Sequence, residues 1–312
     1  MIFFNQDEQL ALLGRQILET TWTKFPTLAR NQIALTWIIY DSPILVNTGG
    51  ALTPDAFWNY PVRGFAYRGI EKIYPANIVQ LFYLVALHEW LDKKMVNSSV
   101  EIERAMRNMI VNSSNNATSL IVDVLTGTTS GPELPSAPFE TWQYQRQIIN
   151  RYYQSLNWPE LDNINICQKT WDDGPYGRER VFYGETLENQ NILTTNATAI
   201  LLHSIIGGVA VSRKRSQSIM TLLEYRPNPS RFSKRIKKNY LTGFLGSALT
   251  QNSKIWSKTG WTSRVRHDAA YIEIPDKFPY LLVVFTEGEK NARNEDMLPF
   301  ISQQFMDNAN NL

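Results

Sequence analysis

Three short segments of the chain hold side chains that could together bind or activate a carbonyl compound. Lys258-Thr259-Gly260 offers an ammonium group and a hydroxyl on a segment typical of a β-strand. Ser113-Ser114-Asn115 offers hydroxyls and an amide just before a segment with helical periodicity. Asn77 and Gln80 stand three residues apart at the start of an apolar helix. An ammonium group can bind a carboxylate, and a serine hydroxyl can attack a carbonyl when a nearby base takes its proton.

The pair at the start of the apolar helix cannot supply that reaction by itself. Positions three apart on a helix share one face, so Asn77 and Gln80 should lie side by side. An amide is neither a competent nucleophile nor a base, although it donates and accepts hydrogen bonds. No serine in the chain has a lysine three residues later. The pattern predicts either a polar site without a nucleophile and base on this helix, or two satisfied polar groups at a helix start.

Each of the other two segments also has a structural interpretation. Ser113-Ser114-Asn115 is equally typical of a helix N-cap, because its hydroxyls and amide can accept the first free backbone N–H groups. Lys258, taken alone, is typical of a solvated lysine on a strand. The functional interpretation therefore depends on the segments meeting in space.

The remaining reactive residue types favour structural roles. His267 and Asp268 are neighbours on a predicted strand, so their side chains should face opposite sides and cannot easily form one catalytic pair. His88 lies within an apolar helix and Cys167 is the sole cysteine, which favours core positions for both. A basic run is typical of a solvated helix face or loop, with an anion-binding patch as the alternative. It consists of Arg231, Lys234, Arg235, Lys237 and Lys238.

Helices are expected mainly in the middle of the chain. Residues 76–93 are apolar nearly all round, which predicts a buried rather than an amphipathic helix. Ser99 and Thr194 fit N-cap positions, and Gly127 fits a helix end. Further helices are predicted at 5–24, 99–109, 116–125, 139–156, 195–206 and 297–306.

The segment 157–191 is predicted to be irregular, and a loop of that length is usually functional or a shaped Ω-type loop. Arg178-Glu179-Arg180 could hold it through an internal salt bridge. Its acidic candidates are Glu160, Asp172, Asp173 and Glu179.

Strands are expected towards both ends of the chain, at 33–40, 64–67, 254–261, 265–274 and 280–286. Helices between two groups of strands predict an α+β fold. An antiparallel sheet built from both chain ends would form an α/β sandwich lobe, and the middle would form an all-α lobe. We expect a single two-lobed domain over residues 1–312, with the sheet lobe at about 1–72 and 240–312 and the helical lobe at about 73–239.

Composition excludes several classes of protein. Of the 312 residues, 43% are hydrophobic and 12% aromatic, which suffices for a sizeable core and is unlike a disordered chain. The formal net charge of +2 gives no electrostatic reason to expect a nucleic-acid partner. One cysteine and three scattered histidines offer no metal cluster, so no metal or other cofactor is predicted.

The sequence predicts no membrane span and shows no signal peptide. The longest apolar stretch, residues 78–91, is about 14 residues long, short of the roughly 20 needed to cross a bilayer. The first residues include Asp7 and Glu8 and no basic region before an apolar core. We expect a cytoplasmic location, or a periplasmic or extracellular one if the chain has been trimmed.

Taken in order, the three segments resemble the serine β-lactamase and penicillin-binding protein superfamily, and most of all the class A β-lactamase pattern. That pattern is S-x-x-K, then S-D-N or S-x-N, then K-T-G. The order of elements is similar over roughly residues 25 to 310. The resemblance implies that Ser113 and Asn115 line one wall of a cleft between the lobes. It places Lys258 and Thr259 on the other wall, where they could hold a carboxylate, and the strand edge after Gly260 could pair with an amide of an extended ligand.

The chain departs from this family at its reactive residues. Where the family has the serine and lysine of S-x-x-K, the sequence reads Asn77-Ile78-Val79-Gln80, in a register set by Tyr74-Pro75-Ala76. The family also uses a glutamate in an E-x-x-L-N context to activate the deacylating water. No acid of the segment 157–191 stands in that context.

Three functions are compatible with the resemblance and the departure. The first is a catalytically degenerate member that binds a peptide-like or β-lactam-like ligand, or a protein partner, in the cleft. The second is an active hydrolase in which Ser113 is the nucleophile and Lys258 its base. The third is an interaction protein that uses only the scaffold. The sequence favours the first, because nucleophile and base are both replaced while the other two motifs remain.

Overall fold

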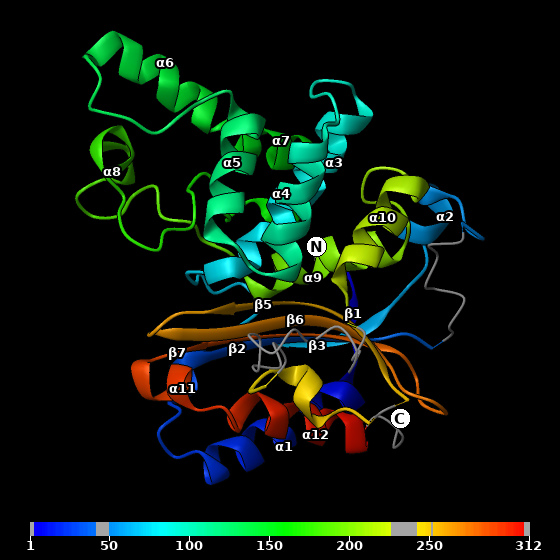
Figure 1. Ribbon diagram of the computed structural model, residues 1–312. Coiled ribbons are helices and arrows are strands. Elements are labelled where there is room, and N and C mark those ends of the chain that lie inside the picture. Colours follow the sequence, from blue (N-terminus) through cyan, green and yellow to red (C-terminus); the bar gives the residue numbers. More distant parts are fainter. Residues whose placement is uncertain (1–2, 42–49, 226–241, 251, 309–312) are drawn as a thin grey trace, which may run out of the picture.

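The computed structural model describes residues 3–41, 50–225, 242–250 and 252–308. A twisted sheet lies at its centre, with one layer of helices from the two chain ends on one face and the helices of the middle on the other (Figure 1). This is the α+β arrangement expected from the sequence, with strands contributed by both ends of the chain. The basic run at 231–238 lies outside the described residues.

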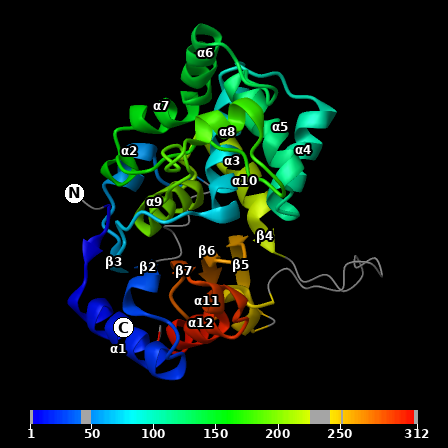
Figure 2. The same ribbon diagram turned by 90° about the vertical axis from the view of Figure 1, so that its left-hand side faces the viewer.

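The described residues form a seven-stranded sheet in the order β1-β3-β2-β7-β6-β5-β4. The short strand β1 pairs with β3 in parallel, and the other pairings are antiparallel. Figure 2 shows β3, β2, β7, β6 and β5 side by side in that order. The strands are β1 (Asn5–Gln6), β2 (Ile33–Ile39), β3 (Arg63–Tyr67), β4 (Glu224–Tyr225), β5 (Lys254–Trp261), β6 (Val265–Glu273) and β7 (Tyr280–Glu287).

The helices agree with the expected ones at most positions. Ser99, Ser114 and Thr194 are N-caps whose hydroxyls accept backbone N–H groups, and Gly127 ends its helix with a φ of +63°. The helices are α1 (Glu8–Lys24), α2 (Pro54–Trp58), α3 (Val79–Asp92), α4 (Val100–Val111), α5 (Asn115–Thr126), α6 (Ser136–Arg146), α7 (Ile148–Ser155), α8 (Gly177–Tyr183), α9 (Thr195–Ile206), α10 (Arg213–Leu223), α11 (Glu289–Arg293) and α12 (Met297–Asn308). The first predicted helix starts later than expected, because residues 5–6 form β1.

Each face of the sheet carries its own hydrophobic core, because successive side chains of a strand point to opposite faces. Along β6, Ala269 and Tyr271 pack with the helices of the middle, whereas Ala270 and Ile272 pack with α1 and α12. Helix α3 lies in the first of these cores and is buried nearly all round, as predicted. No described helix is long and apolar enough to cross a bilayer.

The predicted single helix at 139–156 is wrong, because the chain forms α6 and α7 with a break at Gln147. The two helices bury their side chains in different places. Trp142 of α6 packs with Cys167 and Phe182. Tyr153 of α7 packs instead in the core between the sheet and the middle helices, next to α3. One straight helix could not serve both clusters.

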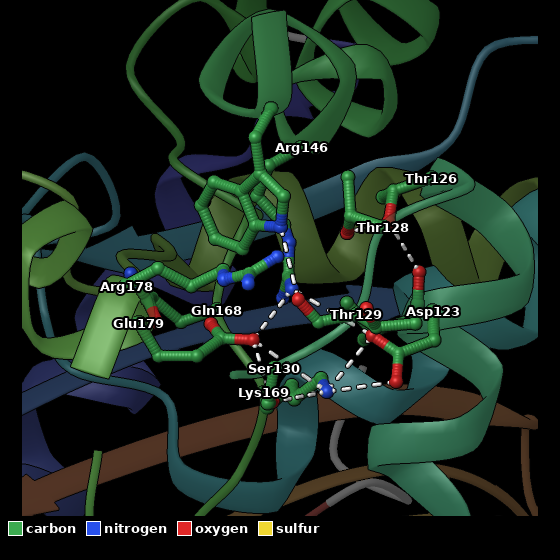
Figure 3. A network of polar contacts seen from close by, with 12 residues as sticks. Asp123, Thr126, Thr128, Thr129, Ser130, Arg146, Gln168, Lys169, Arg178 and Glu179 are labelled. Atoms are coloured by element: carbon green, nitrogen blue, oxygen red, sulfur yellow. Dashed lines mark hydrogen bonds and ion pairs between the residues drawn. The ribbon is translucent and has the colours of Figure 1, made fainter. Parts of the chain in front are cut away.

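The segment 157–191 is more ordered than predicted, since it contains α8 and a cluster of buried ions (Figure 3). Arg146 donates to Glu179 at 2.6 Å, and both side chains are fully buried. Lys169 lies 2.8 Å from Asp123 of α5 and donates to Ser130 at 2.7 Å. The expected salt bridge inside the segment is present, because Glu179 lies 3.5 Å from Lys169, and Glu179 also pairs with Arg146 of α6. Arg178 does not take part and donates to the Pro132 carbonyl oxygen.

We predict that Glu179→Gln lowers the free energy of unfolding by about 3–5 kcal/mol, because it removes the carboxylate 2.6 Å from the buried Arg146 and leaves only Asp123, 3.6 Å away, to balance that charge. The matched control is Glu19→Gln, which removes the same charge from an exposed pair with Arg30 and should cost less than about 1 kcal/mol. Urea unfolding of both variants measures the difference. Equal losses would show that the buried cluster does not hold the segment.

Candidate functional site

The residues just before α3 are held against strand β5. Ala76 has a φ of +46°, a left-handed conformation that is costly for a residue with a side chain. The chain continues through a 3₁₀ segment, Ala76–Ile78. A Cβ atom at Gly260 would lie 2.8 Å from the Pro75 carbonyl oxygen, so glycine is what permits this approach. Gly260 therefore has a packing role at the place where the sequence predicts a ligand-binding strand.

His267 and Asp268 lie on opposite faces of β6, as predicted. His267 Nε2 donates to the Tyr74 carbonyl oxygen at 2.9 Å, and its Nδ1 accepts the Thr286 N–H at 3.1 Å. Burial lowers the pKa of His267 to about 4, so the ring is neutral near pH 7. Asp268 accepts the Leu245 N–H at 2.9 Å on the other face. His267 thus holds the residues before α3 on the sheet.

Asn77, in the 3₁₀ segment before α3, and Gln80, in the first turn of α3, both face α5. Asn77 Nδ2 donates to Asn115 Oδ1 at 3.0 Å, and Gln80 Nε2 donates to Thr118 Oγ1 at 2.8 Å. Asn77 and Gln80 are three positions apart, and so are their partners Asn115 and Thr118. Each pair therefore lies on one face, and the two hydrogen bonds run side by side between these faces. Gln80 is fully buried, whereas Asn77 is half-buried. Both amides act as hydrogen-bonding groups between helices, and neither offers a nucleophile or a base.

Ser113 and Lys258 meet across the boundary between the helices and the sheet. Lys258 Nζ donates to Ser113 Oγ at 2.5 Å and to its neighbour's carbonyl oxygen, on Thr259, at 3.0 Å. Ser113 has a φ of +49°, and Ser114 is the residue that caps α5. The N-cap interpretation is thus correct for Ser114, while the Ser113 hydroxyl contacts the lysine.

Lys258 is not the solvated strand lysine that its residue type alone favours, because only 3% of its surface is exposed. Burial lowers its pKa from 10.5 to about 7, with the Asp268 carboxylate acting in the opposite direction. Near pH 7 the amine is therefore populated both with and without its charge. A buried amine of this kind can either bind an anion or accept a proton.

A small cavity of about 100 Å³ opens beside this contact. Ligand pockets commonly measure about 300–1,000 Å³, so this volume suits a single group such as a carboxylate rather than a whole ligand. Strand β4 contributes to the lining and could not be predicted from the sequence, because a strand of two residues carries no periodic signal. The cavity is lined by Ile110, Val111, Ser113, Leu222, Leu223, Glu224, Tyr225, Ser257, Lys258 and Thr259.

Of the four acidic candidates in the segment 157–191, Asp172 is the one that contacts a side chain of this site. Asp172 Oδ1 accepts an N–H of Asn115 Nδ2 at 2.6 Å. Glu160 instead accepts the Phe3 N–H at 2.6 Å, and Glu179 lies in the buried ion cluster. Asp173 accepts the Tyr176 hydroxyl. The segment therefore brings one carboxylate to Asn115.

His88 and Cys167 occupy core positions, as predicted. Burial lowers the pKa of His88 to about 4 and raises the pKa of the Cys167 thiol to about 12, so neither side chain is charged near pH 7. Within the described ranges, no three His, Cys, Asp or Glu side chains are grouped so as to hold a metal ion.

Comparison with known proteins places this geometry in context. A family model described as "Beta-lactamase enzyme family" matches residues 88–309. No curated protein matches the chain. The solved structure of PBP-A is similar over 99% of this chain and 98% of its own, at 16% identity and a TM-score of 0.66. A beta-lactamase from Sphaerobacter thermophilus is similar over 95% and 97%, at 15% identity and a TM-score of 0.60. The class A beta-lactamase of the last common ancestor of Gram-negative bacteria is similar over 95% and 99%, at 16% identity and a TM-score of 0.58.

At these identities the likeness shows the fold alone, and it confirms the class A β-lactamase-like α+β fold expected from the sequence. The division into lobes near residues 72 and 240 stays a prediction.

We predict that Lys258 makes the free energy of unfolding increase as pH rises above 7. The unfolded chain keeps the Lys258 proton up to about pH 10.5, whereas the folded chain releases it near 7, so unfolding takes up a proton between these values. The advantage of the wild type over Lys258→Met should grow by about 2–2.5 kcal/mol between pH 7.5 and 9.5. Chemical unfolding at both pH values tests this. A constant difference would mean that Lys258 keeps its charge in the folded state.

Proposed function

The chain belongs to the beta-lactamase enzyme family, and on that premise we propose that it is a catalytically degenerate member that binds a carboxylate-bearing, peptide-like or β-lactam-like ligand. The observation that carries the proposal is the pair Asn77 and Gln80, at the start of α3. Their side-chain amides form hydrogen bonds with residues of α5. By resemblance these positions are those of the S-x-x-K serine and lysine. The replacements keep the hydrogen bonds between the helices and remove nucleophile and base.

The binding groups of the family pattern remain beside them. Lys258 and Ser113 supply an ammonium group and a hydroxyl at one cavity, and Thr259 lies next to them on β5. A charged amine in a largely buried position binds a carboxylate more strongly than an exposed one, because water screens the pair less. A cavity of about 100 Å³ can admit the anionic group of a small ligand, which favours such a ligand over a protein as the binding partner.

The edge of β5 offers a second means of binding. Within the described residues, β4 pairs only with Ile255 and Trp256, so no described strand covers the edge from Ser257 onward. An extended ligand could add an amide there through main-chain hydrogen bonds while its carboxylate contacts Lys258. This arrangement suits a ligand with a carboxylate near an amide, which both peptides and penicillins provide.

A second candidate is an active hydrolase, and the contact between Lys258 and Ser113 is the observation that favours it. With a pKa of about 7, the Lys258 amine is partly uncharged at neutral pH and can then accept the Ser113 proton. Ser113 Oγ would attack the amide carbonyl, and its proton would pass to Lys258. The carbonyl–nitrogen bond would break as Lys258 returns that proton to the nitrogen, and water would release the acyl group.

We predict that penicillin G forms no covalent adduct with the wild-type protein, whereas Asn77→Ser/Gln80→Lys gains a mass equal to one penicillin G. The double substitution restores a hydroxyl and an amine three residues apart on one face. Intact-protein mass spectrometry after equal incubation measures both. Asn77→Ala/Gln80→Lys is the matched control, because it has the amine without the hydroxyl and should stay unmodified.

The same experiment separates the two candidates. A wild-type adduct that maps to Ser113 and disappears in Ser113→Ala would establish the hydrolase and contradict the degenerate member. Restored acylation only in the serine variant would support the degenerate member. A protein that neither binds penicillin G nor gains an adduct in the restored variant would point to a scaffold used for interaction alone.

A further inference from the structure

The amine of Lys258 is buried without a carboxylate in contact. Its Nζ has two hydrogen-bond partners, the Ser113 hydroxyl at 2.5 Å and the Thr259 carbonyl oxygen at 3.0 Å. Both partners are neutral, and no carboxylate of the described residues forms an ion pair with this lysine. The Asp268 carboxylate lies on the opposite face of the sheet, where it accepts the Leu245 N–H. The ammonium form of Lys258 therefore lacks the partner that would repay its burial.

The cavity beside Lys258 combines these polar groups with an apolar wall. Strand β4, which follows α10 and pairs with β5, adds Glu224 and Tyr225 to the lining (Figure 2). A volume of about 100 Å³ is roughly that of three liquid water molecules, so the cavity suits a molecule of a few carbon atoms. The apolar residues come from the last turns of α4 and α10 and are Ile110, Val111, Leu222 and Leu223.

An uncharged lysine amine is a nucleophile, whereas its ammonium form is not. An exposed lysine has a pKa of about 10.4, so only about one such amine in 2,500 is uncharged at pH 7. Burial lowers the pKa of Lys258 to about 7, which leaves about half of these amines uncharged at that pH. The cavity adds space for a reactant beside Lys258 and Ser113. A desolvated lysine next to an apolar pocket is suited to forming Schiff bases with carbonyl compounds.

We propose that Lys258 forms an imine with small aliphatic aldehydes, whose alkyl chain packs against the apolar wall of the cavity. This activity goes beyond the proposed binding function, because it makes a covalent bond and needs no carboxylate on the ligand. A carbonyl group on a short alkyl chain matches the two kinds of lining, a reactive amine and four apolar residues.

The reaction uses the contact between Lys258 and Ser113. Nζ attacks the carbonyl carbon, and the π electrons of the C=O bond move to the oxygen as the C–N bond forms. Ser113 Oγ, 2.5 Å from Nζ, takes one Nζ proton and passes its own proton to that oxygen, which gives a carbinolamine. The second Nζ proton then passes to the new hydroxyl group, which leaves as water while the nitrogen lone pair forms the C=N bond. One amine and one aldehyde become one imine and one water, and nothing is oxidised or reduced.

Reductive trapping tests this on the wild-type protein. Propanal with sodium cyanoborohydride at pH 7 converts an imine into a stable propylamine, and peptide mapping by mass spectrometry locates it. We expect Lys258 to be modified at least about tenfold faster than Lys254, an exposed lysine on the same strand. Mapping also separates Lys258 from the α-amino group, whose ordinary pKa of about 8 makes it reactive too. Lys258→Met should lose this adduct, and Lys254→Met should keep it.

Two further measurements distinguish a shaped site from a lysine that is only reactive. The titratable groups around the amine are Glu224 and Tyr225 at the cavity and Asp268 across the sheet. The rate at Lys258 should level off above pH 7, whereas the rate at exposed lysines should rise about tenfold per pH unit up to pH 9. Naphthaldehyde, whose fused rings exceed the cavity, should modify exposed lysines and leave Lys258 unmodified.

Equal rates at Lys258 and Lys254, a rate at Lys258 that keeps rising to pH 9, or equal modification of both by naphthaldehyde would overturn the proposal. These measurements use the wild type, so they do not depend on the folding of Lys258→Met. If propanal leaves Lys258 unmodified while penicillin G binds, imine formation is wrong and the binding function stands. If propanal modifies Lys258 while penicillin G does not bind, the binding function fails and imine formation stands.

Discussion

The site depends on one close approach, that of strand β5 to the residues that precede α3. Gly260 lies against the Pro75 carbonyl oxygen, and His267 of the neighbouring strand β6 donates a hydrogen bond to the Tyr74 carbonyl oxygen. This contact fixes the 3₁₀ segment before α3 on the sheet, with Ala76 in a left-handed conformation. Because β5 is held there, Lys258 is buried beside Ser113, and its lowered pKa follows from that burial. The polar site thus results from packing between the sheet and one helix start.

Two separate sets of polar contacts hold the elements around the candidate site in place. Asn77 and Gln80 join α3 to α5, which keeps Ser113 and Asn115 at the start of α5 in place. The buried ions around Arg146 and Glu179 fix the segment that carries Asp172. An ion cluster in that position adds little net stability relative to an apolar core, so its value lies in holding the segment in one arrangement. The side chains that we propose to bind a ligand are therefore held in place by residues that we do not expect to touch it.

Much of the fold could be predicted from local pattern, and the site could be predicted only in part. The strands at 254–261 and 280–286 and the buried helix at 76–93 carry strong apolar periodicity, and the structure has them close to the expected bounds. The break at Gln147 could not be predicted, because it depends on where Trp142 and Tyr153 are buried. The contact of Ser113 with Lys258 joins residues far apart in sequence, and only the family resemblance suggested it. The partners of Asp172 and Glu179 also depend on tertiary packing, so their residue types alone could not separate an exposed carboxylate from a buried ion.

The central claim is that the cleft binds an amide-containing carboxylate without breaking it. A crystal structure of the wild-type protein soaked with penicillin G tests this most directly. We expect an intact lactam, with its carboxylate within hydrogen-bond distance of Lys258 Nζ and no covalent bond to any side chain. An opened lactam bonded to Ser113 Oγ, or penicillin G bound away from Lys258, would contradict it.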